Sequence, residues 1–475
     1  MTTLFLPCAQ GVEELLADEV RRITGTAAEQ ARGGVWLEGD EHTAMRLNLH
    51  SRLAQRVLIE LQHGPYRSEQ DLYNAAANVA WEIWFTPAQT FKVEITAQHS
   101  PLQSLNFAAL KIKDAIADRF RAKFDDVRPS VDTRWPDVRV YVHLTVDMVT
   151  IYIDTSGEPL FKRGWREDKG DAPLKETLAA AMIAASGWNA DDGVALYDPC
   201  CGSGTIAIEA AQIACHIAPG INRRFAFQKY LPYQPHVWEG LLDQAEAAIT
   251  EPTAPVFGSD VSFRMVDFAE RNAERAGVAN AVQFRGGDAL QRMPPAPNGV
   301  MLVNPPYGER IDVAGVAGTS ALQARDQRRD NRETRADSFQ GQPIDEFGQP
   351  ISQDAGDHRD SRDDAGFEPS RDRSANPGRE QAQTEAGEAA SDFFPQLATH
   401  WKKNYAGWTA HVLTPDLKLP NKMRLKESRR VPMWNGPIEC RLFRFDMVAG
   451  SARGKPVAAF TPSPVHGRAT VFKVK

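Results

Sequence analysis

The chain has 475 residues, of which 42% are hydrophobic and 25% are charged, as in ordinary globular proteins. This composition excludes a fibrous or wholly disordered chain, and the length predicts two to four domains of about 100–200 residues. No apolar run approaches the roughly 18–20 residues that cross a bilayer, and the amino end lacks a secretory signal pattern. Five cysteines without zinc-type spacing indicate reduced thiols. We therefore expect a cytoplasmic protein with no membrane partner and no metal.

The net charge of −7 is unevenly distributed along the chain. The stretch Ala324–Ser391 holds 10 arginines, no lysine and 16 acidic residues, and it contains no Leu, Val, Met, Trp, Tyr or Cys. Such a stretch cannot bury enough apolar surface to fold, so we expect a disordered acidic and arginine-rich insertion at 312–391. In contrast, Trp401–Lys475 holds 15 basic and 4 acidic residues, and a locally basic surface can bind a polyanion.

The first 160 residues mix strands and helices without regular alternation, which predicts an α+β region. In the unit 1–65 the expected strands are Leu4–Cys8, Gly34–Leu37 and Arg56–Leu61, and the expected helices are Gly11–Ile23 and Glu41–Leu49. In the unit 66–160 we expect helices at Ser68–Phe85 and Asn106–Phe124, a strand at Phe91–Ala97 and a hairpin of Arg139–Val146 with Val149–Asp154.

From residue 161 to 475 short apolar strands alternate with helices, a pattern that predicts an α/β domain with a doubly wound, Rossmann-like sheet. The expected helices are Leu174–Ser186, Gly204–Ala214, Ser262–Ala276 and Phe393–Tyr405, with a loop and helix at Pro219–Gln244. The expected strands end at Asp198 or span Val256–Asp260, Val282–Arg285, Val300–Val303 and Ala410–Leu413. Because the pattern continues after residue 391, the insertion interrupts a single domain.

The segment ALYDPCCGSGTIAIEAA combines a strand end, a glycine turn and a helix. Gly202 and Gly204 let the backbone turn tightly and approach a ligand closely. Asp198 ends the strand, where open α/β sheets bind ligands. The spacing differs from both the dinucleotide fingerprint and the phosphate-binding P-loop. A carboxylate beside this turn suits a cationic, hydroxyl-rich ligand such as S-adenosylmethionine, although the turn alone is also compatible with no ligand.

Two further acidic residues follow the next strands. Asp260 ends the second strand, where a carboxylate can accept both hydroxyls of a ribose, and it precedes a helix that it could also cap. Asp288 follows the third strand, either beside an adenine amino group or as a solvated loop acid.

The segment VNPPYGER after the fourth strand is the most specific motif. Two prolines remove N–H donors, so Asn304 Oδ1 and the Pro305 carbonyl are left as acceptors and Tyr307 offers a flat face. Such a site can hold a planar –NH2 group, and its hydrogen bonds strengthen as the nitrogen becomes a nucleophile. The motif therefore predicts an amino-methyltransferase.

The motifs DPCCGSG, GSD, GGDAL and NPPYGER, in this order, resemble class I S-adenosylmethionine-dependent methyltransferases of the N6-adenine/N2-guanine type. The segment Phe161–Ile183 resembles the one that precedes the core in THUMP-containing RNA guanine-N2 methyltransferases. The resemblance implies a ferredoxin-like unit at 1–65 and a THUMP-like RNA-binding domain at 66–160. It also implies that a second methyltransferase domain, present in larger relatives, is absent.

The resemblance also implies roles for particular residues. Asp198, Gly202, Gly204, Asp260 and Asp288 match the cofactor-binding positions, whereas Asn304, Pro305, Pro306 and Tyr307 match the catalytic motif. Arg163, Arg166 and Lys175 could reach RNA phosphate or the cofactor, or could be solvated.

We therefore expect methylation of guanine N2 in RNA, most simply 23S rRNA, with the basic segment Lys418–Arg430 holding the backbone. Three alternatives remain open at this point: a tRNA guanine-N2 methyltransferase, a protein glutamine-N5 methyltransferase and a non-catalytic RNA-binding assembly factor.

Overall fold

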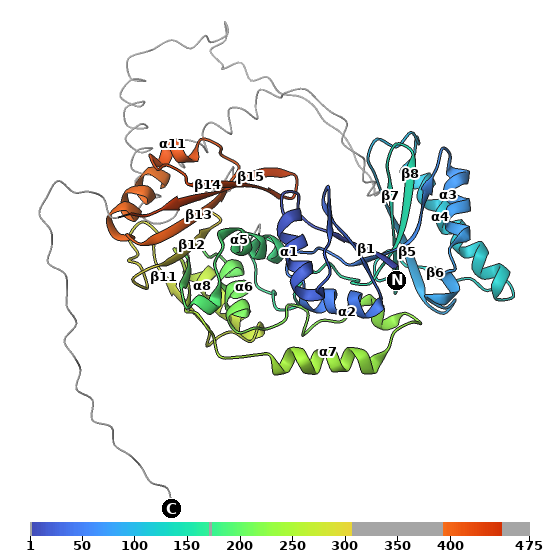
Figure 1. The fold of residues 1–475 in the computed structure, drawn as a ribbon, viewed down its shortest axis with the longest axis horizontal. Helices are drawn as coiled ribbons and strands as arrows, with labels where there is room; N and C mark the ends of the chain where they lie inside the picture. Colours follow the sequence, from blue (N-terminus) through green and yellow to red (C-terminus); the bar gives the residue numbers. More distant parts are fainter. Residues whose placement is uncertain (1, 171–172, 306–392, 449–475) are drawn as a thin grey trace, which may run out of the picture.

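The computed structural model describes residues 2–170, 173–305 and 393–448 (Figure 1). These residues form two sheets, one of eight strands in the amino-terminal half and one of seven strands in the carboxy-terminal half. The predicted α/β domain behind an α+β region is therefore confirmed. The insertion predicted at 312–391 lies outside the described residues. The domain boundaries at 65 and 160 stay predictions.

The eight-stranded sheet has the order β2-β3-β1-β4-β8-β7-β5-β6. Its first strands and helices are β1 (Thr2–Pro7), α1 (Glu13–Thr24), β2 (Glu29–Ala31), β3 (Gly34–Gly39), α2 (Glu41–His50) and β4 (Leu58–Pro65). Its second set is α3 (Glu69–Asn78), η1 (Trp81–Ile83), β5 (Thr90–Ala97), α4 (Leu105–Lys123), β6 (Ser130–Val131), β7 (Val138–Leu144) and β8 (Met148–Asp154). The antiparallel pair β4–β8 joins the two sets into one sheet.

Alternation along the strands fixes which face of this sheet is buried. Leu4 and Leu6 of β1 are fully buried, whereas Phe5 between them is partly exposed. Val138, Val140 and other alternate residues of β7 are buried in the same way. Because burying one such aliphatic side chain stabilises the fold by about 1.5–3 kcal/mol, the alternation sets the register of each strand.

The seven-stranded sheet has the order β11-β10-β9-β12-β13-β15-β14. Its elements are α5 (Glu176–Ser186), β9 (Ala195–Asp198), α6 (Thr205–Ala214), η3 (Ala226–Lys229), α7 (Pro235–Ala247), β10 (Val256–Asp260), α8 (Phe263–Arg275), β11 (Val282–Gly286), β12 (Gly299–Val303), β13 (Trp408–Thr414), α11 (Leu419–Met423), β14 (Arg429–Asn435) and β15 (Ile438–Asp446). Residues 393–404 are helical. Strands β9 to β13 run parallel, and β15 pairs antiparallel with β13. The strand order reverses between β9 and β12, so this is the switch point at which open α/β sheets bind ligands.

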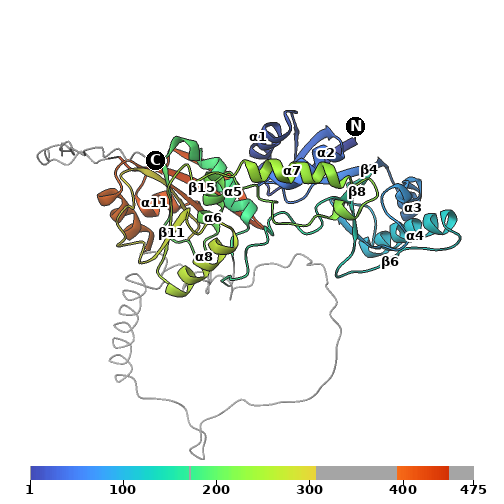
Figure 2. The ribbon, with the colours of Figure 1, turned by 90° about the horizontal axis from the view of Figure 1, so that it is seen from below.

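The two halves meet through buried ion pairs and close backbone contacts. Arg52 of the amino-terminal unit and Arg163 of the linker, the segment 155–175 between β8 and α5, both pair with Glu209 of α6, with N–O distances of 3.1 and 3.0 Å. At the β14 edge, the amide of Trp434 donates to the carbonyl of Gln10. Both views place α7 beside α2 of the amino-terminal unit (Figures 1 and 2).

Two expectations about the elements were wrong, and one pair of strands was missed. The helix expected over Ser68–Phe85 ends at Asn78, because the Trp81 indole donates to the Ala76 carbonyl and a separate 3-10 turn follows. The helix expected to end by Gln244 runs on to Ala247. The hairpin of β14 and β15 was not predicted. Within the described ranges, no helix is both long and apolar enough to cross a membrane.

Candidate active site

The predicted site residues follow strands that end at one edge of the seven-stranded sheet. Tyr197 of β9 pairs with Met301 of β12, and Asp198 pairs with Gly258 of β10. Because these strands are parallel, Asp198, Asp260 and Asn304 lie at their carboxyl ends around the switch point. The structure therefore brings three predicted site residues to one place.

The turn after β9 is held by carboxylates. The Cys200 amide donates to Asp198 Oδ1 at 3.1 Å, and the Gly202 amide donates to Asp260 Oδ2 at 2.9 Å. Gly202 and Gly204 have φ values of 52° and 90°, a region that favours glycine. A Cβ at Gly204 would come within 3.0 Å of Ala269 and Phe284, whereas one at Gly202 would meet nothing within 4 Å. The space beside Gly202 thus admits a ligand against the backbone.

Burial raises the pKa of two carboxyl groups at this edge of the sheet, those of Asp198 and Asp260. Asp198 is 2% exposed, and burial raises its pKa to about 8, with a smaller contribution from the charge of Asp260. Burial also raises the pKa of Asp260, although the amides of Ser262 and Gly202 oppose this shift. A cationic ligand would favour the ionised form of both groups, so the site suits a positively charged group.

Asp260 does not cap α8 in the way the sequence allowed. Its Oδ1 accepts from the amide of Ser262 at 2.9 Å, and Ser262 itself stands at the N-cap position. The carboxylate therefore links the start of α8 to the Gly202 turn. Asp288 Oδ1 accepts from the Leu290 amide at 2.9 Å, which orders the turn after β11.

Phe263, which begins α8 three residues after Asp260, was not predicted as a site residue. Its side chain is 80% exposed, which is unusual for phenylalanine. The ring lies so close to Gly286, at the end of β11, that a Cβ there would come within 2.5 Å of it. An aromatic residue three positions after an acidic strand end was the available signal. The exposed ring offers a flat apolar surface to an adenine-sized group.

Asn304 follows β12 with its side-chain oxygen turned away from solvent. Its Oδ1 is buried and has no hydrogen-bond partner within the described part of the chain. Pro305, the next residue, is buried as well. The other two residues of the predicted catalytic motif, Pro306 and Tyr307, lie outside the described residues. An unpaired acceptor of this kind is ready for a donor from a ligand.

Two of the three predicted cationic residues are used inside the protein. Arg163 is 3% exposed and pairs with Glu209, so neither a solvated nor a phosphate-binding role fits it. Arg166 pairs with Glu176 at 2.8 Å and donates to Thr205 Oγ1 at 2.8 Å and Ser203 Oγ at 3.3 Å. It therefore supports the glycine turn from behind. Lys175 is exposed.

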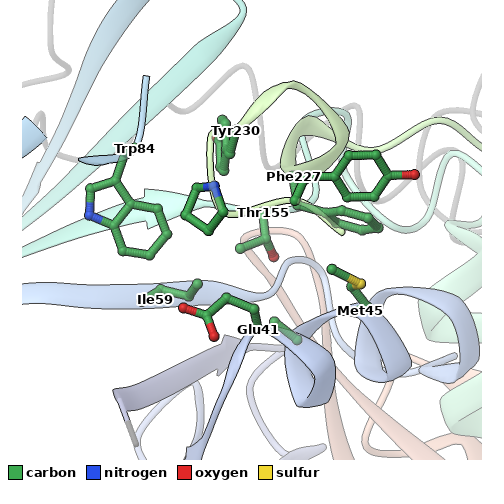
Figure 3. A pocket seen from close by; sticks show the side chains of 10 residues that line it. Glu41, Met45, Ile59, Trp84, Thr155, Phe227 and Tyr230 are labelled. Carbon is green, nitrogen blue, oxygen red and sulfur yellow. The ribbon is translucent and has the colours of Figure 1, made fainter. Parts of the chain in front are cut away.

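A small pocket elsewhere in the molecule is apart from this chemistry. It lies where α2 and β4 meet the region of Trp84 and the segment of Phe227 and Tyr230 (Figure 3). Its walls are mainly apolar, and the Tyr230 hydroxyl donates to the Asp154 carbonyl. We interpret it as a gap in the packing between the amino-terminal sheet and the segment of Phe227 and Tyr230 before α7.

Models of three domain families match the chain. The RlmL ferredoxin-like domain matches residues 3–58, the THUMP domain matches 66–154, and the RMKL-like methyltransferase domain matches 163–320. The matched ranges follow one another along the chain in the order ferredoxin-like domain, THUMP domain and methyltransferase domain.

Curated relatives match nearly the whole length of the chain. The protein named ribosomal RNA large subunit methyltransferase K/L of Shewanella pealeana is 34% identical over 458 residues, which is 95% of this chain and 54% of the relative. The protein of the same name from Psychromonas ingrahamii is 32% identical over 98% of this chain and 54% of its own length. The chain thus spans about half the length of these relatives. A methyltransferase structure in complex with SAH is 24% identical, with a TM-score of 0.71 over 96% of this chain and 99% of that chain, which shows the shared fold.

The cofactor implied by the methyltransferase domain is S-adenosylmethionine. The site fits it, because the group carries an amino cation, a sulfonium, a ribose and an adenine. The buried Asp198 and the open space at Gly202 suit the cationic part, and Asp260 and Phe263 suit the nucleoside.

Proposed function

We propose that this chain methylates the exocyclic N2 of a guanine in RNA, with 23S rRNA as the substrate. The observation that carries the proposal is the buried Oδ1 of Asn304 at the switch point of the sheet, which has no hydrogen-bond partner among the described residues. Leaving a buried acceptor unpaired costs roughly 1–3 kcal/mol, so its retention is explained when a ligand supplies the donor. The amine of guanine is such a donor.

The chemistry follows from the acceptor. S-adenosylmethionine supplies an electrophilic methyl group when bound. An aryl amine is a weak nucleophile because its lone pair is delocalised into the ring. Asn304 Oδ1 accepts one N–H of the amine, and this bond strengthens as positive charge grows on the nitrogen. Pro305 adds a carbonyl acceptor without a competing N–H. In the proposal Pro306 presents no N–H to the site, and Tyr307 stacks on the base.

The cofactor roles proposed for the remaining residues follow their positions. Asp198 faces the amino group, Asp260 the ribose, and Asp288 the adenine side, while Gly202 and Gly204 shape the turn. The contacts of Asp198 with the Cys200 amide and of Asp260 with the Gly202 amide support this proposal, because they hold both carboxylates beside the glycine turn.

RNA as substrate is supported by the THUMP match and by the names of the curated relatives. A basic surface after β13 agrees with it. Its exposed residues are Lys418, Lys422, Arg424, Lys426, Arg429 and Arg430. In the sequence they follow β13, the strand next to β12, and Arg429 and Arg430 begin β14, at the register of His411 and Val412 in the middle of β13. Contacts with phosphate are the main source of affinity in such surfaces.

The test is nucleoside mapping in a strain that lacks the gene. We expect one N2-methylguanosine to disappear from 23S rRNA and to return when the intact gene is restored, but not with the Asn304→Ala variant. Loss of the nucleoside from tRNA, or loss of methylated glutamine from a protein, would identify a different substrate. Unchanged N2-methylguanosine in rRNA would contradict the proposal.

A further inference from the structure

We propose that a polar cleft beside the active site binds a phosphate and base of the RNA strand next to the target guanine. The cleft lies between the amino-terminal unit, the start of α5 and the tip of the β14–β15 hairpin. The inference rests on the proposed function, because it names where the same RNA is held.

The cleft is built from three separate parts of the chain and has a volume of about 170 Å³. Gln10 and Gln55 line it from the amino-terminal unit, Lys175 and Thr177 from the start of α5, and Trp434 and Asn435 from the hairpin. The Trp434 amide donates to the Gln10 carbonyl, so the hairpin is fastened to the opposite wall. The cleft therefore exists only while the two halves of the protein are docked.

Its chemistry favours an anion with an attached ring. No acidic residue lines it, and Lys175 is its single cation. The Lys175 ammonium lies over the Phe161 ring at 4.9 Å and has no acidic partner among the residues described. The 11-residue helix α5 begins here without a side-chain cap, which adds positive potential. Amide side chains can donate to phosphate oxygens, and the partly buried Trp434 indole can stack on a base.

A short chain of contacts connects this cleft to the cofactor turn. Glu176, next to Lys175, pairs with Arg166 at 2.8 Å. Arg166 in turn donates to Ser203 and Thr205, which flank Gly204. Glu176 and Arg166 therefore connect the cleft to the glycine turn. Arg429 and Arg430 lie at the opposite, amino end of β14. An RNA strand that crosses from the amino-terminal unit to the catalytic edge passes the cleft.

The first test is a salt titration of RNA binding with Lys175→Ala. The probe is unmodified 23S rRNA transcript, and the control is Lys162→Ala, a lysine of the same segment that pairs with Glu158. Loss of one single-strand phosphate contact lowers the slope of log K against log salt by about 0.7. We expect that decrease for Lys175→Ala, no decrease for Lys162→Ala, and unchanged S-adenosylmethionine affinity in both. A wild-type slope for Lys175→Ala, or an equal loss of cofactor affinity, would overturn the assignment.

The second test addresses the base. Trp434→Ala should weaken RNA binding about 5- to 100-fold through lost stacking, and Trp434→Phe should restore most of the affinity. Both variants must melt like the wild type, since Trp434 also contacts Arg441 at 5.9 Å. If folded Trp434→Ala binds RNA normally, the cleft does not hold a base. These assays measure binding, so they decide on the cleft even if the wild-type protein forms no N2-methylguanosine, a result that would contradict the proposed function instead.

Discussion

The amide of Gly202 donates to Oδ2 of Asp260 across 58 residues of sequence, at 2.9 Å. The carboxylate at the end of β10 therefore holds the turn that follows β9. Its other oxygen accepts from Ser262 at the start of α8. One side chain thus ties together the two strand ends and the helix that frame the proposed cofactor site.

Asp260→Ala should destabilise the protein as well as weaken cofactor binding. Two backbone donors lose their acceptor, and a buried donor without a partner costs roughly 1–3 kcal/mol. The control is Asp267→Ala on α8, whose exposed ion pair with Arg271 contributes at most about 1 kcal/mol. Urea unfolding of both variants measures the difference. Equal stability of the two variants would show that the Asp260 contacts do not hold the turn.

Asp198 should make stability depend on pH. Burial raises its pKa from 3.8 to about 8, so the native state keeps a proton that the unfolded chain releases. This contribution to stability is fully present below about pH 4 and is lost as the pH rises through about 8. The free energy of unfolding, measured from pH 5 to pH 9, should therefore fall less steeply in Asp198→Asn than in the wild type.

The same variant should alter cofactor binding. A cationic ligand favours the ionised carboxylate, so binding at pH 7 releases protons and its enthalpy depends on the buffer. Calorimetry in two buffers should show this dependence for the wild type. Asp198→Asn should bind the cofactor weakly, and its binding enthalpy should not depend on the buffer through this proton. Unchanged affinity would remove Asp198 from the site.

Arg163→Met should destabilise the junction between the two halves. Burial alone would raise the pKa of Glu209, but Arg163 and Arg52 hold it below its usual range. Removing one partner of a buried pair typically costs about 3–5 kcal/mol. Urea unfolding should show such a loss, whereas Arg21→Met, at the exposed pair with Asp18, should cost under about 1 kcal/mol. A small loss for Arg163→Met would mean that Arg52 alone satisfies Glu209.

Asn304→Ala should separate catalysis from stability. The variant removes an acceptor that has no partner among the described residues, so the melting temperature should not fall. Loss of one contact made in the transition state typically slows turnover about 100- to 1,000-fold. The control is Asn298→Ala in the exposed loop before β12, which should keep the wild-type rate. Single-turnover assays and calorimetry with S-adenosylmethionine distinguish a catalytic loss from a loss of cofactor binding.

Local patterns predicted much of the methyltransferase sheet. The strand Val256–Asp260 was predicted with the bounds that the structure shows, because its apolar run is bounded by a proline and an acidic turn. The hairpin of β14 and β15 was missed, since Pro432 and several charged residues weaken the strand pattern. Gly436, with φ of 62°, starts its two-residue connection and was the overlooked signal.

Site residues could be predicted only where they lie at the end of a strand or in the turn that follows it. The sequence pattern led to Asp198, Asp260 and Asn304, and the structure brings them together; their roles stay predictions. The partners of Arg163 and Arg166 were not predictable, because Glu209 and Thr205 meet them only after α6 packs against the linker. The fusion of two amino-terminal units through β4 and β8 likewise depends on long-range pairing.

The most direct test of the proposed function is the identity of the methylated nucleoside. The purified protein is incubated with labelled S-adenosylmethionine and unmodified 23S rRNA, and the RNA is then digested to nucleosides. The proposal predicts that label appears in N2-methylguanosine with the wild type and Asn298→Ala, and at least 100-fold more slowly with Asn304→Ala. Label in N6-methyladenosine, or on protein glutamine instead of RNA, would contradict it.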